Sequence, residues 1–145
     1  AIQVVATDHC PFSSRDEKQL GKENFSKCPN GLPGVEERIP LLFSEGVMKG
    51  RISINRFVEV CCTNPAKLFG IYPQKGSLLP GSDGDVVIID PEKEVSLTQS
   101  LLHSRVDYTA YEGFPLKGYP IMTISGGEVI VRDSEFVGAK GRGRY

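Results

Sequence analysis

The stretch Val4-Val5-Ala6-Thr7-Asp8-His9-Cys10-Pro11-Phe12 decides how the fold is interpreted. An apolar run, Ile2 to Ala6, leads into Asp8 and then into a loop that Pro11 interrupts. This pattern predicts a buried strand that ends on a carboxylate. Barrel enzymes of the (β/α)8 type carry their catalytic residues at the C-terminal ends of parallel strands. Asp8 is therefore the first candidate for a catalytic residue.

Asp8 also has a purely structural interpretation, because an aspartate at the end of a strand often caps the turn that follows. His9 is a weaker candidate, since neighbouring residues of a strand point to opposite faces. His103 lies in residues 100–119, a segment that no pattern assigns. We expect His103 to face solvent or to have a structural role.

The start of the chain predicts a larger protein. The sequence begins at Ala1 without an initiator methionine, and the strand predicted at residues 2–6 would need neighbours on both edges. We therefore expect this sequence to be the C-terminal part of a larger enzyme. The same feature argues against a free-standing binding module with a small β-domain, because an unpaired strand edge favours association.

Composition excludes several classes of partner. The chain has 145 residues, 39% hydrophobic and 24% charged, which suits a globular protein. A net charge of -1 with interspersed signs predicts no nucleic-acid partner. The basic end, residues 140–144, is short and glycine-spaced, and we interpret it as a solvated tail. No apolar run approaches the roughly 18 residues of a membrane span, so no membrane partner is expected.

The cysteines indicate a reducing compartment. Cys10, Cys28, Cys61 and Cys62 have spacings that fit no zinc-ribbon pattern. We expect them to be buried or half-buried thiols, and hence a cytoplasmic protein.

The two halves of the chain differ in the secondary structure that their sequences predict. Residues 1–74 predict a strand, a long polar loop from Phe12 to Gly34, and helices, whereas residues 75–145 predict short strands and turns. A long loop without structure of its own is usually functional or mobile.

Three helices are predicted in the first half. The first starts near Val35, is delayed or kinked by Pro40, and ends at Gly46 or Gly50. Ser53 can cap the second helix. A short third helix should have Asn64 as its N-cap and Pro65 at its first position, with Gly70 as the stop.

The second half predicts a sheet. The continuous apolar run Val86-Val87-Ile88-Ile89 fits a strand that is buried on both faces. Residues 121–124 and 129–131 flank Ser125-Gly126-Gly127-Glu128, which favours a β-hairpin. Asp83 and Asp85, on either side of Gly84, indicate a tight turn rather than a metal site.

Asn30 lies among glycines and prolines that allow two interpretations. An Asn-Gly pair is most often simply a turn. Alternatively, the rigid segment from Pro29 to Gly34 holds backbone N–H and C=O groups beside a site, where they orient a polar substrate.

The chain resembles the C-terminal part of a D-hydantoinase or dihydropyrimidinase, in the cyclic amidohydrolase group. The resemblance extends almost from end to end, and the order of the matching segments makes it specific. These segments are Thr7-Asp8-His9-Cys10-Pro11-Phe12, Gly21-Lys22-Glu23-Asn24-Phe25-Ser26-Lys27, Pro29-Asn30-Gly31-Leu32-Pro33-Gly34-Val35-Glu36-Glu37-Arg38, Ser44-Glu45-Gly46-Val47, Asn64-Pro65-Ala66-Lys67-Leu68-Phe69-Gly70, Lys75-Gly76-Ser77, Gly81-Ser82-Asp83-Gly84-Asp85-Val86-Val87-Ile88 and Phe136-Val137-Gly138.

The resemblance implies an α/β fold. Members of the family have a (β/α)8 TIM barrel and a β-sandwich built from both chain ends. Residues 1–74 would then be the end of the barrel, namely its last strand and flanking helices. Residues 75–145 would supply the C-terminal strands of the β-sandwich and a tail. A dimer or tetramer of identical subunits is also implied.

The resemblance also implies chemistry. The family hydrolyses the ring amide bond of 5-substituted hydantoins or dihydropyrimidines with two zinc ions, which a hydroxide and a carbamylated lysine bridge. The aspartate that matches Asp8 binds one zinc ion and moves a proton from the nucleophile to the leaving nitrogen. The asparagine that matches Asn30 contacts the cyclic amide through its main chain. Bound metal can lower the pKa of water to about 7, which makes hydroxide available at neutral pH.

The other metal ligands of the family have no counterpart here. Its His-x-His pair, its lysine and its two later histidines all precede the last barrel strand, so we expect this piece alone to be inactive. Two alternatives stay open: a non-catalytic dihydropyrimidinase-related scaffold protein, which shares the fold without the ligands, and an allantoinase or dihydroorotase. Asp8 and the Asn-Gly-Leu-Pro-Gly segment favour the hydantoinase type.

Overall fold

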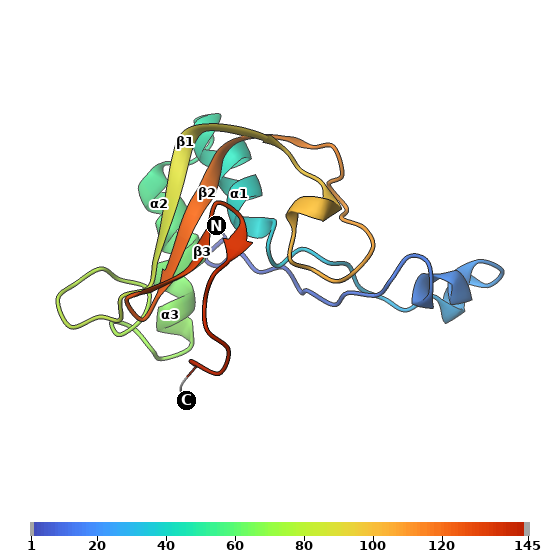
Figure 1. Cartoon of the computed structure of the whole chain (residues 1–145), viewed down its shortest axis with the longest axis horizontal. Coiled ribbons are helices and arrows are strands. Elements are labelled where there is room, and N and C mark those ends of the chain that lie inside the picture. The colour runs from blue at the N-terminus through green and yellow to red at the C-terminus, as the bar shows by residue number, and fades with distance from the viewer. Residues whose placement is uncertain (1, 144–145) are drawn as a thin grey trace.

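A computed structural model describes residues 2–143 of the chain. It shows a body in which three α-helices lie beside an antiparallel sheet, and a long loop near the N-terminus that projects away from this body (Figure 1). In the described residues, the α-helices come before residue 70 and the strands come after residue 85.

The prediction of a strand at residues 2–6 is wrong for the described chain. This segment is extended but pairs with no strand, and its one backbone hydrogen bond within the described residues runs from the amide of Val5 to the carbonyl of Val60, at 3.2 Å. Helix side chains bind its carbonyl groups instead. Arg38 donates to Val5 at 2.9 Å and Asn64 donates to Gln3 at 2.8 Å. The described residues contain no parallel strand with which the segment could form a ladder.

The loop from Phe12 to Gly34 contains two short 3-10 helices, η1 (Glu17–Gly21) and η2 (Phe25–Lys27). Figure 1 shows this loop, in blue, as the part farthest from the sheet. Its base is fixed by Asp107, whose carboxylate accepts hydrogen bonds from the amide and the hydroxyl of Ser14 at 2.7 and 2.9 Å. These bonds hold the pKa of Asp107 below its usual value.

The first helix begins late, as Pro40 predicted. α1 (Arg38–Leu42) continues directly into a π-helical turn, η3 (Phe43–Met48). Pro40 lies in the first turn, where backbone N–H groups have no partner within the helix, and its missing donor is tolerated there. The helix passes through Gly46 and ends before Gly50, which has a φ of 65°.

The second and third predicted helices form one continuous rod. α2 (Ile54–Val58) leads through the π-helical turn η4 (Glu59–Thr63) into α3 (Asn64–Leu68). The cap at Ser53 is confirmed, because its hydroxyl accepts a hydrogen bond from the amide of Arg56 at 3.1 Å. The cap predicted at Asn64 is wrong: the backbone is already helical at Thr63, which frees the Asn64 side chain to bind Gln3. The stop at Gly70, with a φ of 70°, is confirmed.

The sheet follows the order of the sequence. β1 (Val86–Ser96), β2 (Pro115–Ser125), β3 (Glu128–Arg132) and β4 (Glu135–Phe136) form an antiparallel meander, and a 3-10 turn, η5 (Gln99–Leu101), lies in the connection between β1 and β2. The predicted hairpin is confirmed, since Ser125 pairs with Glu128. Gly126 and Gly127 supply the positive φ values of 57° and 82° that this two-residue turn requires.

Burial of the first strand on both faces is wrong. Val87 and Ile88 point to opposite faces and keep 47% and 41% of their surface exposed. β1 is an edge strand of the sheet, so its flank has no neighbouring strand in the described part of the chain.

Two apolar clusters join the helices to the sheet. The first consists of Phe43, Phe57, Val60 and Cys61, with the two aromatic rings in edge-to-face contact at 5.6 Å between centroids. The second consists of Leu97, Leu116 and Tyr119. At the junction, the amide of Lys117 on β2 donates to the Ser44 hydroxyl on η3 at 3.0 Å.

The four cysteines are free thiols. Cys61 is buried and Cys28 is half-buried, as predicted, but Cys10 and Cys62 are exposed in the described chain. Desolvation raises the pKa of Cys61 to about 11. Among residues 2–143, no helix is both long enough and apolar enough to cross a bilayer.

Candidate functional site

Asp8 stands at the end of the extended N-terminal segment. Its side chain is exposed, and within residues 2–143 it makes no hydrogen bond or ion pair. Its φ of 47° lies in the left-handed region, which aspartate tolerates better than most residues do. The carboxylate is thus presented to its surroundings without an internal partner.

The residues that follow Asp8 are tied to the segment around Leu32. His9 and Leu32 form an isolated parallel bridge, and the amide of Cys10 donates to the carbonyl of Leu32 at 3.1 Å. The ring Nδ1 of His9 accepts hydrogen bonds from the amides of Gly34 and Val35 at 3.1 and 3.3 Å. His9 therefore has a structural role at Nδ1, which sequence reasoning did not identify.

These contacts place the loop that carries Asn30 next to the residues that follow Asp8. Asn30 is exposed and comes two residues before Leu32, the bridge partner of His9. Gly31 has a φ of 131°, and a Cβ atom there would collide with the carbonyl oxygen of Cys10. Only glycine allows so close an approach of the two backbone segments.

Lys18, on η1, also binds this loop. Its ammonium group donates hydrogen bonds to the carbonyls of Pro29 and Gly31, each at 2.7 Å. Within residues 2–143, the amide and carbonyl of the intervening Asn30 take part in no backbone hydrogen bond. The structure thus ties the residues that follow Asp8 to the loop that carries Asn30, through His9 and Cys10, and Lys18 holds that loop from within.

The ability of this site to hold a metal rests on Asp8. An aspartate carboxylate is a suitable zinc ligand, and the Asp8 carboxylate has no competing internal partner. The described residues contain no group of three or more His, Cys, Asp or Glu side chains with metal-binding geometry. The chain is therefore suited to supply one zinc ligand, the carboxylate of Asp8.

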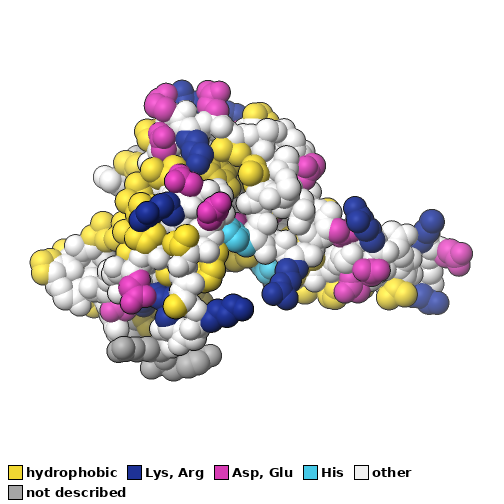
Figure 2. All heavy atoms as spheres, viewed as in Figure 1, with side chains coloured by type: hydrophobic (Ala, Val, Ile, Leu, Met, Phe, Trp, Pro, Cys, Tyr) yellow, Lys and Arg dark blue, Asp and Glu magenta, His cyan; other side chains and the backbone are white. Residues whose placement is uncertain are grey.

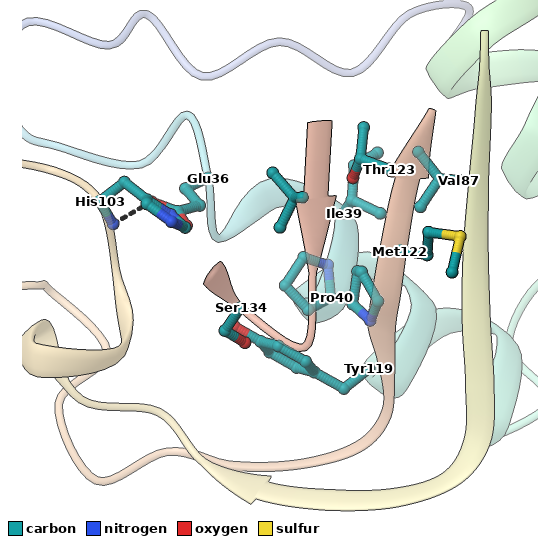
Figure 3. A pocket seen from close by; sticks show the side chains of 11 residues that line it. Glu36, Ile39, Pro40, Val87, His103, Tyr119, Met122, Thr123 and Ser134 are labelled. Atoms are coloured by element: carbon teal, nitrogen blue, oxygen red, sulfur yellow. Dashed lines mark hydrogen bonds and ion pairs between the residues drawn. The ribbon is translucent and has the colours of Figure 1, made fainter. Parts of the chain in front are cut away.

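His103, the second histidine, lies elsewhere. It is exposed, as expected, and its backbone amide and ring Nδ1 bind the two carboxylate oxygens of Glu36 at 2.8 and 2.7 Å. Figure 3 shows this pair at one end of a largely apolar hollow of about 230 Å³ between α1 and the sheet. Neither Asp8 nor Asn30 lines the hollow, which is thus separate from the candidate site.

Charges of both signs are spread over the projecting loop, as Figure 2 shows, and neither sign gathers there into a single patch. The same view shows the histidine side chains where the loop joins the body.

Comparison with known proteins identifies the class. The model of the amidohydrolase family matches residues 1–130, and the chain belongs to this family. It is 57% identical over all 145 residues to the D-phenylhydantoinase of Escherichia coli.

Solved structures agree with this assignment. The dihydropyrimidinase of Brevibacillus agri superposes with a TM-score of 0.95 at 47% identity, over 99% of this chain and 31% of that one. The L-hydantoinase of Arthrobacter aurescens superposes with a TM-score of 0.85 at 38% identity, over 93% of this chain and 30% of that one. The chain spans 32% of the length of the Escherichia coli relative.

Proposed function

We propose that this chain is the C-terminal part of a zinc-dependent cyclic amidohydrolase that hydrolyses the ring amide bond of 5-substituted hydantoins or dihydropyrimidines. The observation that carries the proposal is the 57% identity to a D-phenylhydantoinase over the whole chain. The arrangement of Asp8 beside the Asn30 loop supports it.

In this proposal, residues 1–74 end a (β/α)8 barrel and residues 75–145 belong to a β-sandwich. Residues 2–8 pair with no strand of the described chain, and their backbone groups other than the amide of Val5 and the carbonyls of Ile2, Gln3 and Val5 are available for the neighbouring strands that a barrel requires. The exposed edge strand β1 is likewise available to further strands of a sandwich.

Asp8 has two roles in the proposed mechanism. Its carboxylate would hold one zinc ion, and zinc bound there would supply Lewis-acid polarisation of the substrate carbonyl. Asp8 also accepts the proton that the attacking water loses, and returns it to the ring nitrogen as the amide bond breaks. A carboxylate without an internal hydrogen-bond partner suits this role, because nothing in the described chain competes for its oxygens.

Asn30 orients the substrate through its backbone. A cyclic amide presents a carbonyl oxygen and an N–H group next to each other on a ring. The amide and carbonyl of Asn30 offer the complementary donor and acceptor, and both lack backbone partners within residues 2–143. Backbone groups held in this way fix the orientation of a polar substrate.

The remaining metal site belongs to residues outside this chain in the proposal, namely the other ligands of a binuclear zinc centre and a carbamylated lysine. We also propose a cytoplasmic dimer or tetramer of identical subunits. The isolated 145-residue chain is then inactive, because Asp8 alone cannot assemble a binuclear centre.

The test is expression of the complete gene product, followed by measurement of its zinc content and of its turnover of 5-phenylhydantoin, dihydrouracil, allantoin and dihydroorotate. We expect stoichiometric zinc and turnover of the first two compounds. Turnover of only the last two would assign an allantoinase or dihydroorotase. A zinc-free product without turnover would instead support the non-catalytic scaffold protein.

The isolated chain provides an internal check. We expect it to bind no stoichiometric zinc and to hydrolyse none of these compounds. If the purified 145-residue chain did both, the missing ligands would not be needed and the mechanism would be wrong.

A further inference from the structure

Lys18 makes an unusual set of contacts for a lysine at the protein surface. It is half-buried, and its ammonium group donates to the carbonyls of Pro29 and Gly31 at 2.7 Å each while lying 5.6 Å from the centre of the Phe12 ring. In the part of the chain that the structure describes, no carboxylate pairs with it. All its contacts are thus to backbone oxygens and to an aromatic face, which is a suitable arrangement for an ammonium ion.

The two carbonyls that Lys18 binds are those on either side of Asn30. A single cation that binds both fixes the orientation of the Pro29–Asn30 and Gly31–Leu32 peptide units, which flank the Asn30–Gly31 unit. The carbonyl of Asn30 itself receives no such bond within residues 2–143. Lys18 therefore uses the carbonyls of Pro29 and Gly31 to support the loop, and it leaves the carbonyl of Asn30 for a ligand.

Cys10 and His9 already hold other parts of the loop, through the contact at Gly31 and the bonds to Gly34 and Val35. Lys18 completes the support, because it approaches from η1 and also binds the carbonyl of Pro29, to which neither Cys10 nor His9 donates.

We propose that Lys18 is a positioning residue for substrate binding: its ammonium group holds the loop so that the backbone of Asn30 faces the ring amide of the substrate. The inference rests on the proposed function and deepens it. Lys18 does not touch the substrate. It acts by restricting the loop, which lowers the entropy lost when the substrate binds.

The decisive variant is Lys18→Met in the complete gene product, since methionine keeps the unbranched apolar stem and removes the ammonium group. We expect KM for dihydrouracil or 5-phenylhydantoin to rise about tenfold, with kcat changed much less, because an interaction that orients substrate and transition state equally affects KM alone. Lys18→Arg should recover part of the loss, because a guanidinium group can also donate to two carbonyls.

Lys22→Met is the matched control. Lys22 follows η1 directly, is exposed, and its side chain makes no hydrogen bond or ion pair in residues 2–143. This variant should keep the KM of the unchanged protein. Zinc content is measured in each variant, so that a change in metal loading is not taken for a change in substrate binding.

Hydrogen–deuterium exchange gives a readout that does not depend on turnover. Peptides that span residues 28–35 should exchange faster in Lys18→Met than in the unchanged protein, and Lys22→Met should leave them unaltered. Unaltered exchange together with an unaltered KM in Lys18→Met would overturn the inference. If the protein without substitutions hydrolysed no cyclic amide, the proposed function would be contradicted. Faster exchange in Lys18→Met would then still support the role of Lys18 in holding the loop.

Discussion

The carboxylate of Glu37 accepts a hydrogen bond from the hydroxyl of Thr109 at 2.8 Å, although the two residues are 72 positions apart in the sequence. Glu37 is only 1% exposed and Thr109 is 5% exposed. A buried carboxylate that loses its donor retains the full cost of its desolvation. This pair therefore ties the start of α1 to the connection between β1 and β2.

Thr109→Val should lower the free energy of unfolding by about 1–3 kcal/mol, because valine keeps the shape of threonine but cannot donate to Glu37. Thr98→Val is the matched control, since within residues 2–143 the Thr98 hydroxyl bonds only to that of Ser100, near the surface. Urea unfolding of the complete gene product measures both. Equal decreases in the free energy of unfolding would show that the buried Glu37–Thr109 hydrogen bond stabilises the protein no more than the surface bond of Thr98 does.

Asp8→Ala should reduce hydrolysis by about a thousandfold or more, because in the proposed mechanism one carboxylate serves as metal ligand and as proton carrier. Asn30→Ala should cost less than about tenfold, since its proposed contact is through the backbone, which alanine retains. Asp16→Ala, at an exposed position of the projecting loop, should leave turnover unaltered. Steady-state kinetics on the complete gene product decide the matter, and near-normal turnover of Asp8→Ala would refute the assignment.

Gly118→Ala should be more destabilising than Gly113→Ala. Both glycines have a positive φ, 83° and 75° respectively, so alanine is strained at either position by about 1–2 kcal/mol. A Cβ at Gly118 would also lie 2.5 Å from the Phe43 ring, whereas a Cβ at Gly113 would meet nothing within 4 Å. The collision adds about 1–3 kcal/mol. Thermal unfolding compares the two variants, and equal losses would exclude a packing contribution.

Asp85 should stabilise the protein in a pH-dependent manner. Lys75, at 2.5 Å, and the amide of Gly126 lower the pKa of Asp85 from its ordinary value of 3.8. Since the folded-state pKa is the lower one, the stabilisation is complete above the ordinary value and is lost as the pH falls through the folded value.

Asp85→Asn should therefore lower the free energy of unfolding at pH 7, and the difference from the unchanged protein should shrink as the pH is taken below 3.8. Denaturant titrations of both proteins across this range provide the measurement. A difference that stays constant down to the lowest pH would show that the charge of Asp85 is not responsible.

Cys61 should react last among the four thiols. Its pKa of about 11, raised by desolvation, leaves about one thiolate in a thousand at pH 8, and the residue is 7% exposed. A thiol-reactive dye added to the native protein should label Cys10 before Cys61. Mass spectrometry of the labelled peptides identifies the order, and early labelling of Cys61 would contradict its burial.

Features that depend on neighbouring residues could be predicted from the sequence. The cap at Ser53, the turn at Gly126 and Gly127, and the late start of the helix before Pro40 each follow from local backbone chemistry, which a few adjacent residues determine. Asn64 shows the limit of this reasoning. Its local pattern favours a cap, but a π-helical turn continues the preceding helix into it.

The candidate site could be predicted only in part. Asp8 and Asn30 follow from the strand-end pattern and from the family resemblance. Their supporting residues do not, because His9 meets Gly34 across 25 residues and Lys18 meets Gly31 across 13. Such contacts depend on how the loop folds back on itself, and neither the periodicity nor the composition of the sequence predicts the path of the loop.

The order of the strands has a consequence for how the chain folds. Because β1, β2, β3 and β4 are neighbours both in the sequence and in the sheet, their pairing closes comparatively short loops and should form early. The segment that ends at Asp8 is instead held through partners such as Asn64, 61 residues away from Gln3. Contacts between such distant positions form slowly, so the part of the chain that carries the proposed chemistry should be among the last to reach its place.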